Sequence, residues 1–256
     1  MTGATSDVSD DACLGGRLRL RQPKSGHRAG HDAILLAAAT PARPGDRVVD
    51  FGAGVGTAGL AVATRVTGID LVMIERDENL AGLARINADL NRIAARVCVL
   101  DIAGGAGTFA ASGLGPDSAD VVLMNPPFND STRHRSSPDD IRRTAHMAEP
   151  DTLEAWSHAA RRVLKSGGAL TLIWRADGLA EVLSALERGF GGVAVRSVHA
   201  DASKPAIRVL VRAIKGSRAP LRLCTGLLLN DESGEPNPEA QAILVGGRGL
   251  ALAGDT

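Results

Sequence analysis

The feature that most constrains the fold is a repeated alternation of short apolar runs with segments of helical periodicity, which begins at residue 47. The pattern predicts five βα repeats, with strands at residues 47–51, 69–75, 97–102, 119–124 and 169–175. The clearest helices are expected at residues 57–65, 78–91, 151–164 and 179–188. Because strands joined by helices pair in parallel, the chain is predicted to be an α/β protein with a doubly wound, mostly parallel sheet.

Two further strands, at residues 193–198 and 207–214, are separated only by a loop, so we expect them to form an antiparallel hairpin at the edge of the sheet. Residues 221–229 would add an edge strand. The first residues are small, polar and acidic, a composition that predicts disorder. We therefore divide the chain into a disordered N-terminus, a basic leader with a short helix, the α/β domain, and an edge strand with a tail: residues 1–12, 13–44, 45–215 and 216–256.

Composition excludes several other classes of protein. A length of 256 residues with 44% hydrophobic content suits one domain with a sizeable core. The sequence contains no signal-peptide pattern and no apolar run long enough to span a membrane. Three scattered cysteines, Cys13, Cys98 and Cys224, match neither a metal site nor a disulfide framework. We expect a soluble cytoplasmic protein without a metal, and its zero net charge leaves the choice of partner to local clusters.

A glycine-rich turn, Gly52-Ala-Gly-Val-Gly56, follows the first strand directly and opens a helix. Glycines permit a tight turn and let a ligand approach the backbone. The third glycine comes one residue too early for the dinucleotide fingerprint, which disfavours a pyrophosphate ligand. Glu75, at the end of the second strand, can accept hydrogen bonds from ribose hydroxyls. Asp101 and Ile102, at the end of the third strand, can bind an adenine amine and pack on its ring.

The sharpest functional signal is Asn125-Pro-Pro-Phe128, which begins where the fourth strand ends. Such dipeptides also form ordinary turns, but this run follows a buried strand. The prolines would stiffen the loop and hold the Asn125 amide oxygen and a neighbouring carbonyl as two rigid acceptors. Such acceptors can orient a target –NH2 group toward a methyl donor and stabilise positive charge on its nitrogen. Phe128 can stack on the planar group that carries the amine.

Together, Val48-Val-Asp-Phe-Gly-Ala-Gly-Val-Gly56, Glu75, Asp101 and Asn125-Pro-Pro-Phe128 resemble the class I amino-methyltransferases over residues 45–215. The resemblance implies a Rossmann-like, seven-stranded sheet and S-adenosylmethionine as methyl donor. It implies a cofactor site made by Asp50, Gly52, Gly54, Gly56, Glu75, Asp101, Ile102 and Asn125. It also implies amine recognition by Asn125, in a catalytic pocket shaped by Pro126, Pro127 and Phe128.

A narrower likeness is to the bacterial tRNA (adenine-N6)-methyltransferases that modify valine tRNA. It rests on Gly30-His-Asp-Ala-Ile-Leu-Leu-Ala37 and on Lys204-Pro-Ala-Ile-Arg208. In that family the leader packs near the methionine end of the cofactor, so His31 and Asp32 become further cofactor-binding candidates, with helix capping as the alternative. Many of these relatives have Tyr at the position of Phe128, and Phe also occurs there in guanine-N2 methyltransferases of rRNA, so the base identity stays open.

Basic residues cluster in the leader, in the loop 129–150 and in residues 196–222, which favours an RNA partner because phosphate binding is mainly electrostatic. We expect the target to be adenine N6 in a tRNA anticodon loop, with guanine N2 in rRNA as an alternative. Glutamine-N5 methylation of release factors is a second alternative. It is disfavoured because that family usually carries a helical N-terminal domain, and only about 45 residues precede the first strand. The intact glycine and Asn125 motifs disfavour a third, a non-catalytic binding module.

Overall fold

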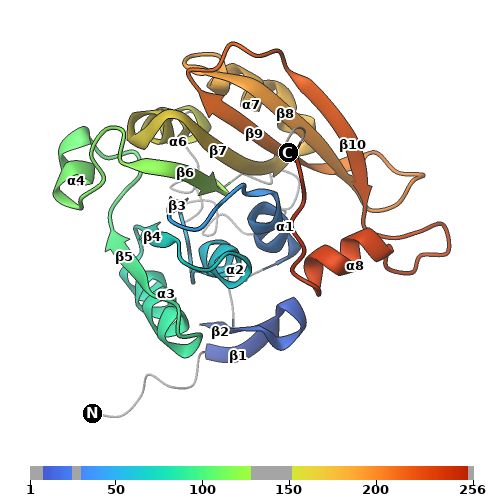
Figure 1. Cartoon of the computed structure of the whole chain (residues 1–256). Coiled ribbons are helices and arrows are strands. Elements are labelled where there is room, and N and C mark those ends of the chain that lie inside the picture. Colours follow the sequence, from blue (N-terminus) through green and yellow to red (C-terminus); the bar gives the residue numbers. More distant parts are fainter. Residues whose placement is uncertain (1–7, 25–29, 128–151, 253–256) are drawn as a thin grey trace, which may run out of the picture.

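The computed structural model describes residues 8–24, 30–127 and 152–252, and it has the predicted α/β architecture (Figure 1). The strands of the main sheet follow the order β10-β8-β9-β7-β6-β3-β4-β5. All of them are parallel except β9, which is antiparallel to both of its neighbours. The strands are β3 (Arg47–Phe51), β4 (Asp70–Glu75), β5 (Ala95–Val99), β6 (Ala119–Met124), β7 (Leu164–Arg175), β8 (Phe190–His199), β9 (Ala206–Lys215) and β10 (Arg222–Leu228).

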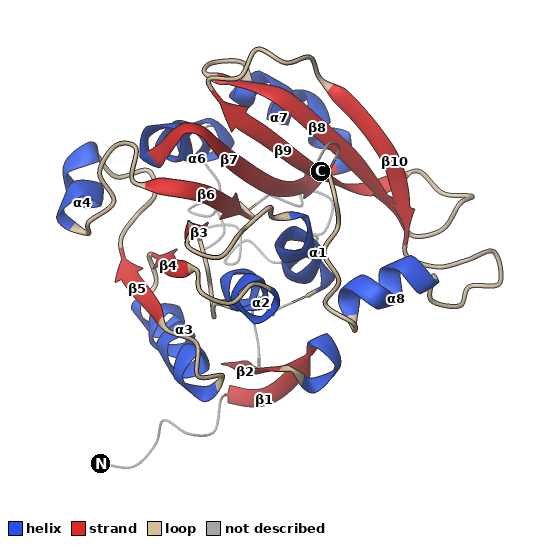
Figure 2. Cartoon of the chain, viewed as in Figure 1, coloured by secondary structure: helices blue, strands red, loops and turns tan. Residues whose placement is uncertain are grey.

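Helices cover both faces of this sheet (Figure 2). One core cluster contains side chains of α1 (His31–Ala39), α2 (Thr57–Arg65), α3 (Glu78–Leu90) and α8 (Pro238–Leu244). The opposite cluster contains side chains of α4 (Ala106–Ala111), α6 (Thr152–Val163) and α7 (Leu179–Leu186). Successive residues of a strand point to opposite faces, so each central strand is buried on both sides. This explains why these strands are continuous apolar runs in the sequence.

The predicted topology is confirmed, and the predicted hairpin is the antiparallel pair β8–β9. Within the described ranges the sheet has eight strands where the family resemblance implied seven, because the additional strand predicted near residues 221–229 joins it as β10. This strand lies beside β8, so β9 is inside the sheet and β10 forms the edge. None of the helices in the described ranges is long and apolar enough to cross a membrane.

The predicted disorder of residues 1–12 is wrong for the part that the structure describes. Val8–Cys13 form β1, which pairs antiparallel with β2 (Leu18–Pro23) in a separate hairpin. Burial is the physical reason, because Leu18 and Leu20 alternate with arginines along β2 and are 0% and 2% exposed. One of the acidic residues that suggested disorder faces a basic one, since Asp10 forms an ion pair of 2.9 Å with Arg21.

Several element boundaries differ from those predicted; β7, for example, begins at Leu164, five residues before its predicted start. β5 ends at Val99, so Asp101 and Ile102 lie in the following loop and not on the strand. The segment after β10 is more ordered than the predicted tail, because α8 forms within it. Asn237 caps this helix by accepting a hydrogen bond from Glu239 N at 2.9 Å, and Pro238 is its first residue, a common arrangement at helix N-termini.

Candidate functional site

Three of the predicted site segments, the glycine turn, Glu75 and Asn125, lie at the carboxyl edge of the sheet. Phe51, the last residue of β3, is in register with Ile74 of β4 and with Met124 of β6. Adjacent strands lie about 4.8 Å apart, so the glycine turn, Glu75 and Asn125 leave neighbouring strands side by side. This edge is where ligands bind in open α/β sheets.

Local geometry favours glycine at all three positions of the glycine turn. Gly52, Gly54 and Gly56 have φ values of 68°, 57° and 91°, a region that other residues adopt with strain. A Cβ atom on Gly52 would overlap the indole of Trp156, and one on Gly56 would lie 2.9 Å from Met73 Sδ. A Cβ atom on Gly54 would meet no described atom within 4 Å. Packing therefore restricts the first and third positions, whereas the backbone at Gly54 is open to a ligand.

The carboxylate of Glu75 connects this turn to the end of β4. Glu75 is 8% exposed, and its Oε2 and Oε1 accept hydrogen bonds from Gly54 N and Asp77 N, both at 2.9 Å. An ionised carboxylate has about four acceptor positions. Two backbone donors therefore leave acceptor capacity on Glu75 for hydroxyl groups of a ligand.

Asp50 lies beneath the turn. It is 2% exposed, and its Oδ2 accepts a hydrogen bond from Gly59 N in α2 at 2.8 Å. Burial is the main cause that raises the pKa of Asp50 to about 7; the hydrogen bond from Gly59 opposes this rise, and the charge of Glu75 adds to it. Among the predicted cofactor residues, Asp50 therefore supports the first turn of α2 from inside the protein.

The segment after β5 brings Asp101 near Glu75, because Leu100 N donates to the Glu75 carbonyl at 3.2 Å. Asp101 is exposed, and its Oδ1 accepts a hydrogen bond from Ala103 N at 2.9 Å. Ile102 is 4% exposed and belongs to the same core cluster as Phe109. Asp101 is thus accessible at this edge, whereas little of Ile102 is available to pack on a ring.

The side-chain oxygen of Asn125 is a buried acceptor without a donor among the described residues. Its Oδ1 is buried and accepts no hydrogen bond from any residue that the structure describes. Leaving a buried acceptor unsatisfied costs about 1–3 kcal/mol, and such a group calls for an explanation. Pro126 is buried and Pro127 is exposed, while Phe128 lies outside the described residues.

The leader helix joins the two segments that carry the narrower family likeness. Asp32 Oδ2 and Arg208 Nε form an ion pair of 2.8 Å, and each side chain is 27% exposed. His31 is exposed at the start of α1. Gly30 is the N-cap and makes no side-chain cap bond, so neither His31 nor Asp32 caps the helix. Of the basic residues predicted to bind RNA, Arg28 and all those of the loop 129–150 lie outside the described residues.

Two residues near the turn were not predicted from the sequence, Trp156 on α6 and Asn87 on α3. Trp156 covers Gly52, and Asn87 donates a hydrogen bond to the Val55 carbonyl at 2.9 Å. Helical periodicity indicates that Asn87 is on the inward face of its helix, but no local pattern shows which backbone groups it meets.

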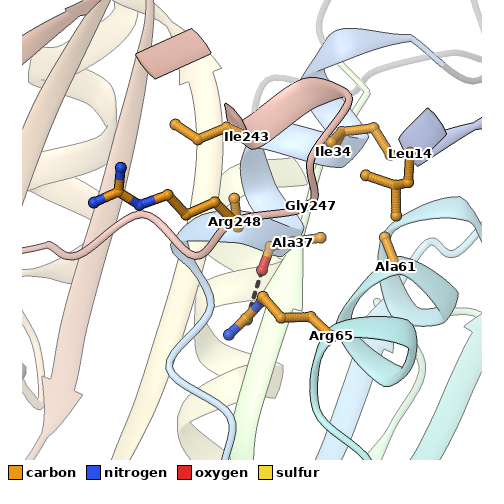
Figure 3. Close-up of a pocket in the computed structure, with 9 residues that line it drawn as sticks. Leu14, Ile34, Ala37, Ala61, Arg65, Ile243, Gly247 and Arg248 are labelled. Atoms are coloured by element: carbon orange, nitrogen blue, oxygen red, sulfur yellow. Dashed lines mark hydrogen bonds between the residues drawn. The ribbon is translucent and has the colours of Figure 1, made fainter. Parts of the chain in front are cut away.

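A small cavity lies elsewhere in the protein, between the leader, α1, α2 and α8 (Figure 3). Leu14, Ile34 and Ile243 contribute to its apolar lining, and Arg65 donates a hydrogen bond of 2.9 Å to the Ala37 carbonyl beside it. Its volume of about 10 Å³ is at the lower limit for a single water molecule. The cavity is therefore too small for a substrate or cofactor.

Comparison with known proteins identifies the family. Residues 29–202, more than half of the chain, match the methyltransferase small domain family. A tRNA1(Val) (adenine(37)-N6)-methyltransferase of Tolumonas auensis is 30% identical over 161 residues, which are 61% of this chain and 63% of that protein. A release factor glutamine methyltransferase of Chlorobaculum tepidum is 26% identical over 167 residues, 63% of this chain and 56% of that protein. The matches thus span less than two thirds of either relative.

Solved structures agree with this assignment. A predicted O-methyltransferase of Agrobacterium tumefaciens superposes with a TM-score of 0.73 at 30% identity and covers 87% of this chain and 100% of its own. The T. thermophilus 16S rRNA N2 G1207 methyltransferase, solved with AdoMet and guanosine, has the same fold, with a TM-score of 0.57 at 17% identity over 84% of this chain and 52% of its own. The chain belongs to the methyltransferase small domain family, and S-adenosylmethionine is its methyl donor.

Proposed function

We propose that this enzyme methylates the exocyclic amine of a base in RNA, and that the base is adenine, modified at N6 in the anticodon loop of a tRNA. The observation that carries the proposal is the buried Oδ1 of Asn125, an acceptor with no donor among the described residues. It lies at the carboxyl edge, next to the glycine turn. An incoming –NH2 group would supply the missing donor.

The residues at this edge suit the cofactor. When bound, S-adenosylmethionine supplies a methyl group activated by its positively charged sulfur. The open side of Gly54 lets the cofactor approach the backbone. Glu75 retains acceptor positions for the two ribose hydroxyls, and the exposed carboxylate of Asp101 can accept a hydrogen bond from the adenine amine.

We assign recognition of the target amine to Asn125. By accepting a hydrogen bond from the target amine, its Oδ1 would hold the nitrogen lone pair toward the methyl group. The same oxygen would stabilise the positive charge that develops on nitrogen during transfer, with no reorganisation of the protein. Pro126 fixes the backbone beside it. Phe128, Pro127 and the leader residues His31 and Asp32 remain candidates for shaping the two ends of the pocket.

An RNA substrate is supported by the tRNA-modifying relative and by the leader. Arg19 is exposed on β2, the strand next to α3, whereas Arg21 forms an ion pair with Asp10. An anticodon-loop adenine is unpaired, so bringing it to Asn125 avoids the few kcal/mol needed to extrude a paired base. An enzyme with this substrate would work in the cytoplasm.

The release-factor relative supports a second candidate, because a glutamine amide is also a planar –NH2 group that Asn125 could accept from. One experiment separates the candidates. The protein is incubated with labelled S-adenosylmethionine and, in separate reactions, with unmodified tRNA, rRNA and release factors, and the labelled nucleosides and amino acids are identified. We expect N6-methyladenine from tRNA. N2-methylguanine from rRNA, or label only on a release-factor glutamine, would reject the proposed substrate.

A further inference from the structure

Two asparagines, Asn87 in α3 and Asn91 at the C-cap of this helix, hold the leader strand to the body of the enzyme. Asn87 Oδ1 accepts a hydrogen bond from Arg21 N at 2.6 Å, and its Nδ2 donates to Arg21 O at 3.0 Å. Asn91 repeats this pattern one turn later, accepting from Arg19 N at 2.9 Å and donating to Arg19 O at 2.6 Å. Each side-chain amide thus binds both backbone groups of one residue of β2.

Helix and strand geometry explain why this arrangement fits. Residues four apart on a helix are separated by about 6 Å along its axis, and alternate residues of a strand by about 6.7 Å. The two amides therefore match the backbone groups of Arg19 and Arg21. These groups form the edge of β2 that faces away from β1, so α3 satisfies it as a third strand would. Figure 1 shows the hairpin lying beside α3 and below α2.

Asn87 differs from Asn91 in one respect. It is 0% exposed, and its Nδ2 also donates to the carbonyl of Val55, inside the glycine turn, at 2.9 Å. Val55 precedes Gly56, the N-cap of α2, so its carbonyl lies outside the hydrogen bonds of the helix. Gly59 N, one of the first amides of α2 that lack a partner within the helix, donates to Asp50. Two buried side chains thus support this segment, Asn87 at the Val55 carbonyl of the turn and Asp50 at the start of α2.

We propose that Asn87 is a positioning residue that couples the leader strand β2 to the glycine turn, so that cofactor binding on the turn also stabilises the leader. A single buried amide satisfies backbone groups of both segments. Asn91 anchors the same strand without contacting the turn. The inference rests on the proposed placement of the cofactor at Gly52–Gly56.

The two asparagines give a matched pair of variants. Asn87→Ala and Asn91→Ala each remove one leader attachment, so both should lower the temperature of thermal unfolding. Only Asn87→Ala removes the bond to Val55, and we expect it to weaken S-adenosylmethionine binding about 3- to 10-fold, as loss of one or two neutral hydrogen bonds predicts. Asn91→Ala should leave the dissociation constant within about twofold of the wild type. Calorimetric titration measures both. Equal effects of the two variants on affinity would overturn the inference.

Hydrogen exchange measures an effect that a purely structural role of Asn87 would not produce. In the wild type, S-adenosylmethionine should slow exchange of the amides of residues 18–22 and leave those of β10, at the far edge of the sheet, unchanged. In the Asn91→Ala protein the leader amides should exchange faster than in the wild type, but S-adenosylmethionine should still slow their exchange. In the Asn87→Ala protein S-adenosylmethionine should no longer slow it. Because the wild-type comparison needs no variant, the test survives if Asn87→Ala does not fold. Absence of slowing in the wild type, or its persistence in Asn87→Ala, contradicts the coupling.

Gly54→Val separates this inference from the site on which it depends. If Gly54→Val abolishes S-adenosylmethionine binding but Asn87→Ala leaves it unchanged, the cofactor lies on the turn and the coupling through Asn87 is wrong. If Gly54→Val has no effect, the placement of the cofactor itself is wrong.

Discussion

Replacing Glu75 with Gln gives a quantitative test of the cofactor site. The carboxylate is 8% exposed and accepts hydrogen bonds from Gly54 N and Asp77 N, so it holds the glycine turn while offering its remaining acceptor positions to a ligand. The Gln side chain has nearly the volume of Glu, but one acceptor oxygen is replaced by an –NH2 donor. This donor would face a backbone N–H or a ligand hydroxyl, from which it cannot accept a hydrogen bond. Hydrogen bonds to a charged group contribute about 1.5–3 kcal/mol. At about 1.4 kcal/mol for each factor of ten, S-adenosylmethionine should bind about 10- to 100-fold more weakly.

Isothermal titration calorimetry of wild-type and Glu75→Gln proteins measures this ratio directly. Thermal unfolding without ligand shows whether the variant remains folded at the titration temperature. The exposed Glu78→Gln substitution in the first turn of α3 is the control, and it should leave affinity unchanged. An affinity for S-adenosylmethionine within about twofold of the wild type in folded Glu75→Gln protein would refute the role of Glu75 in the site.

Three further predictions concern the glycine turn, the buried Asp50 and the ion pair of the leader helix. Gly54→Val should abolish detectable S-adenosylmethionine binding in calorimetry, because a branched side chain would enter the ligand's space from a backbone with φ of 57°; binding close to wild type would contradict the placement of the cofactor. The pKa of Asp50 is about 7 in the folded protein and has its ordinary value of 3.8 in the unfolded chain. The contribution of Asp50 to the free energy of unfolding therefore falls as the pH rises from the lower to the higher of these values. Urea titrations between pH 4 and pH 8 should show that fall in the wild type relative to Asp50→Asn, and parallel profiles would refute it. A double-mutant cycle on Asp32→Asn and Arg208→Gln should give a coupling of about 1 kcal/mol or less in unfolding experiments, since the pair is partly exposed; a coupling above about 2 kcal/mol would contradict this.

The central part of the fold could be predicted because each segment carried its own signal. The first strand ends in a glycine turn, and the bounds predicted for β3 and α2, residues 47–51 and 57–65, agree with the structure. The fourth strand is equally clear, since its apolar run stops at Asn125 and two prolines follow. The expected meeting of Gly52, Glu75 and Asn125 at one edge followed from parallel strand order alone and is confirmed by the register of β3, β4 and β6.

Other elements were missed where one signal hid another. Residues 18–21 alternate between leucine and arginine with the period of a strand, but their positive charge was interpreted as a sign of RNA binding and not of a strand. Asn237 and Pro238 form a recognisable helix start within a polar segment that was expected to be a tail. β5 stops before Asp101 because its last residues are only partly buried, so the apolar pattern does not fix its end.

Long-range contacts had no local signal at all. The ion pair of Asp32 with Arg208, the packing of Trp156 on Gly52 and the bonds of Asn87 to Arg21 and Val55 join segments far apart in the chain. Each depends on how helices pack on the sheet, which periodicity does not determine. The site could therefore be located from the sequence, whereas the groups that support it could not.

Turnover of the Asn125→Ala protein is the most direct test of the central claim, that a buried side-chain oxygen recognises the target amine. The wild type and the variant are compared for S-adenosylmethionine affinity by calorimetry and for kcat on unmodified tRNA by transfer of label. Removing one preorganised acceptor should lower kcat by about 100- to 1,000-fold, while the affinity for S-adenosylmethionine changes by less than about threefold. Turnover near the wild-type value in folded Asn125→Ala protein would contradict the account.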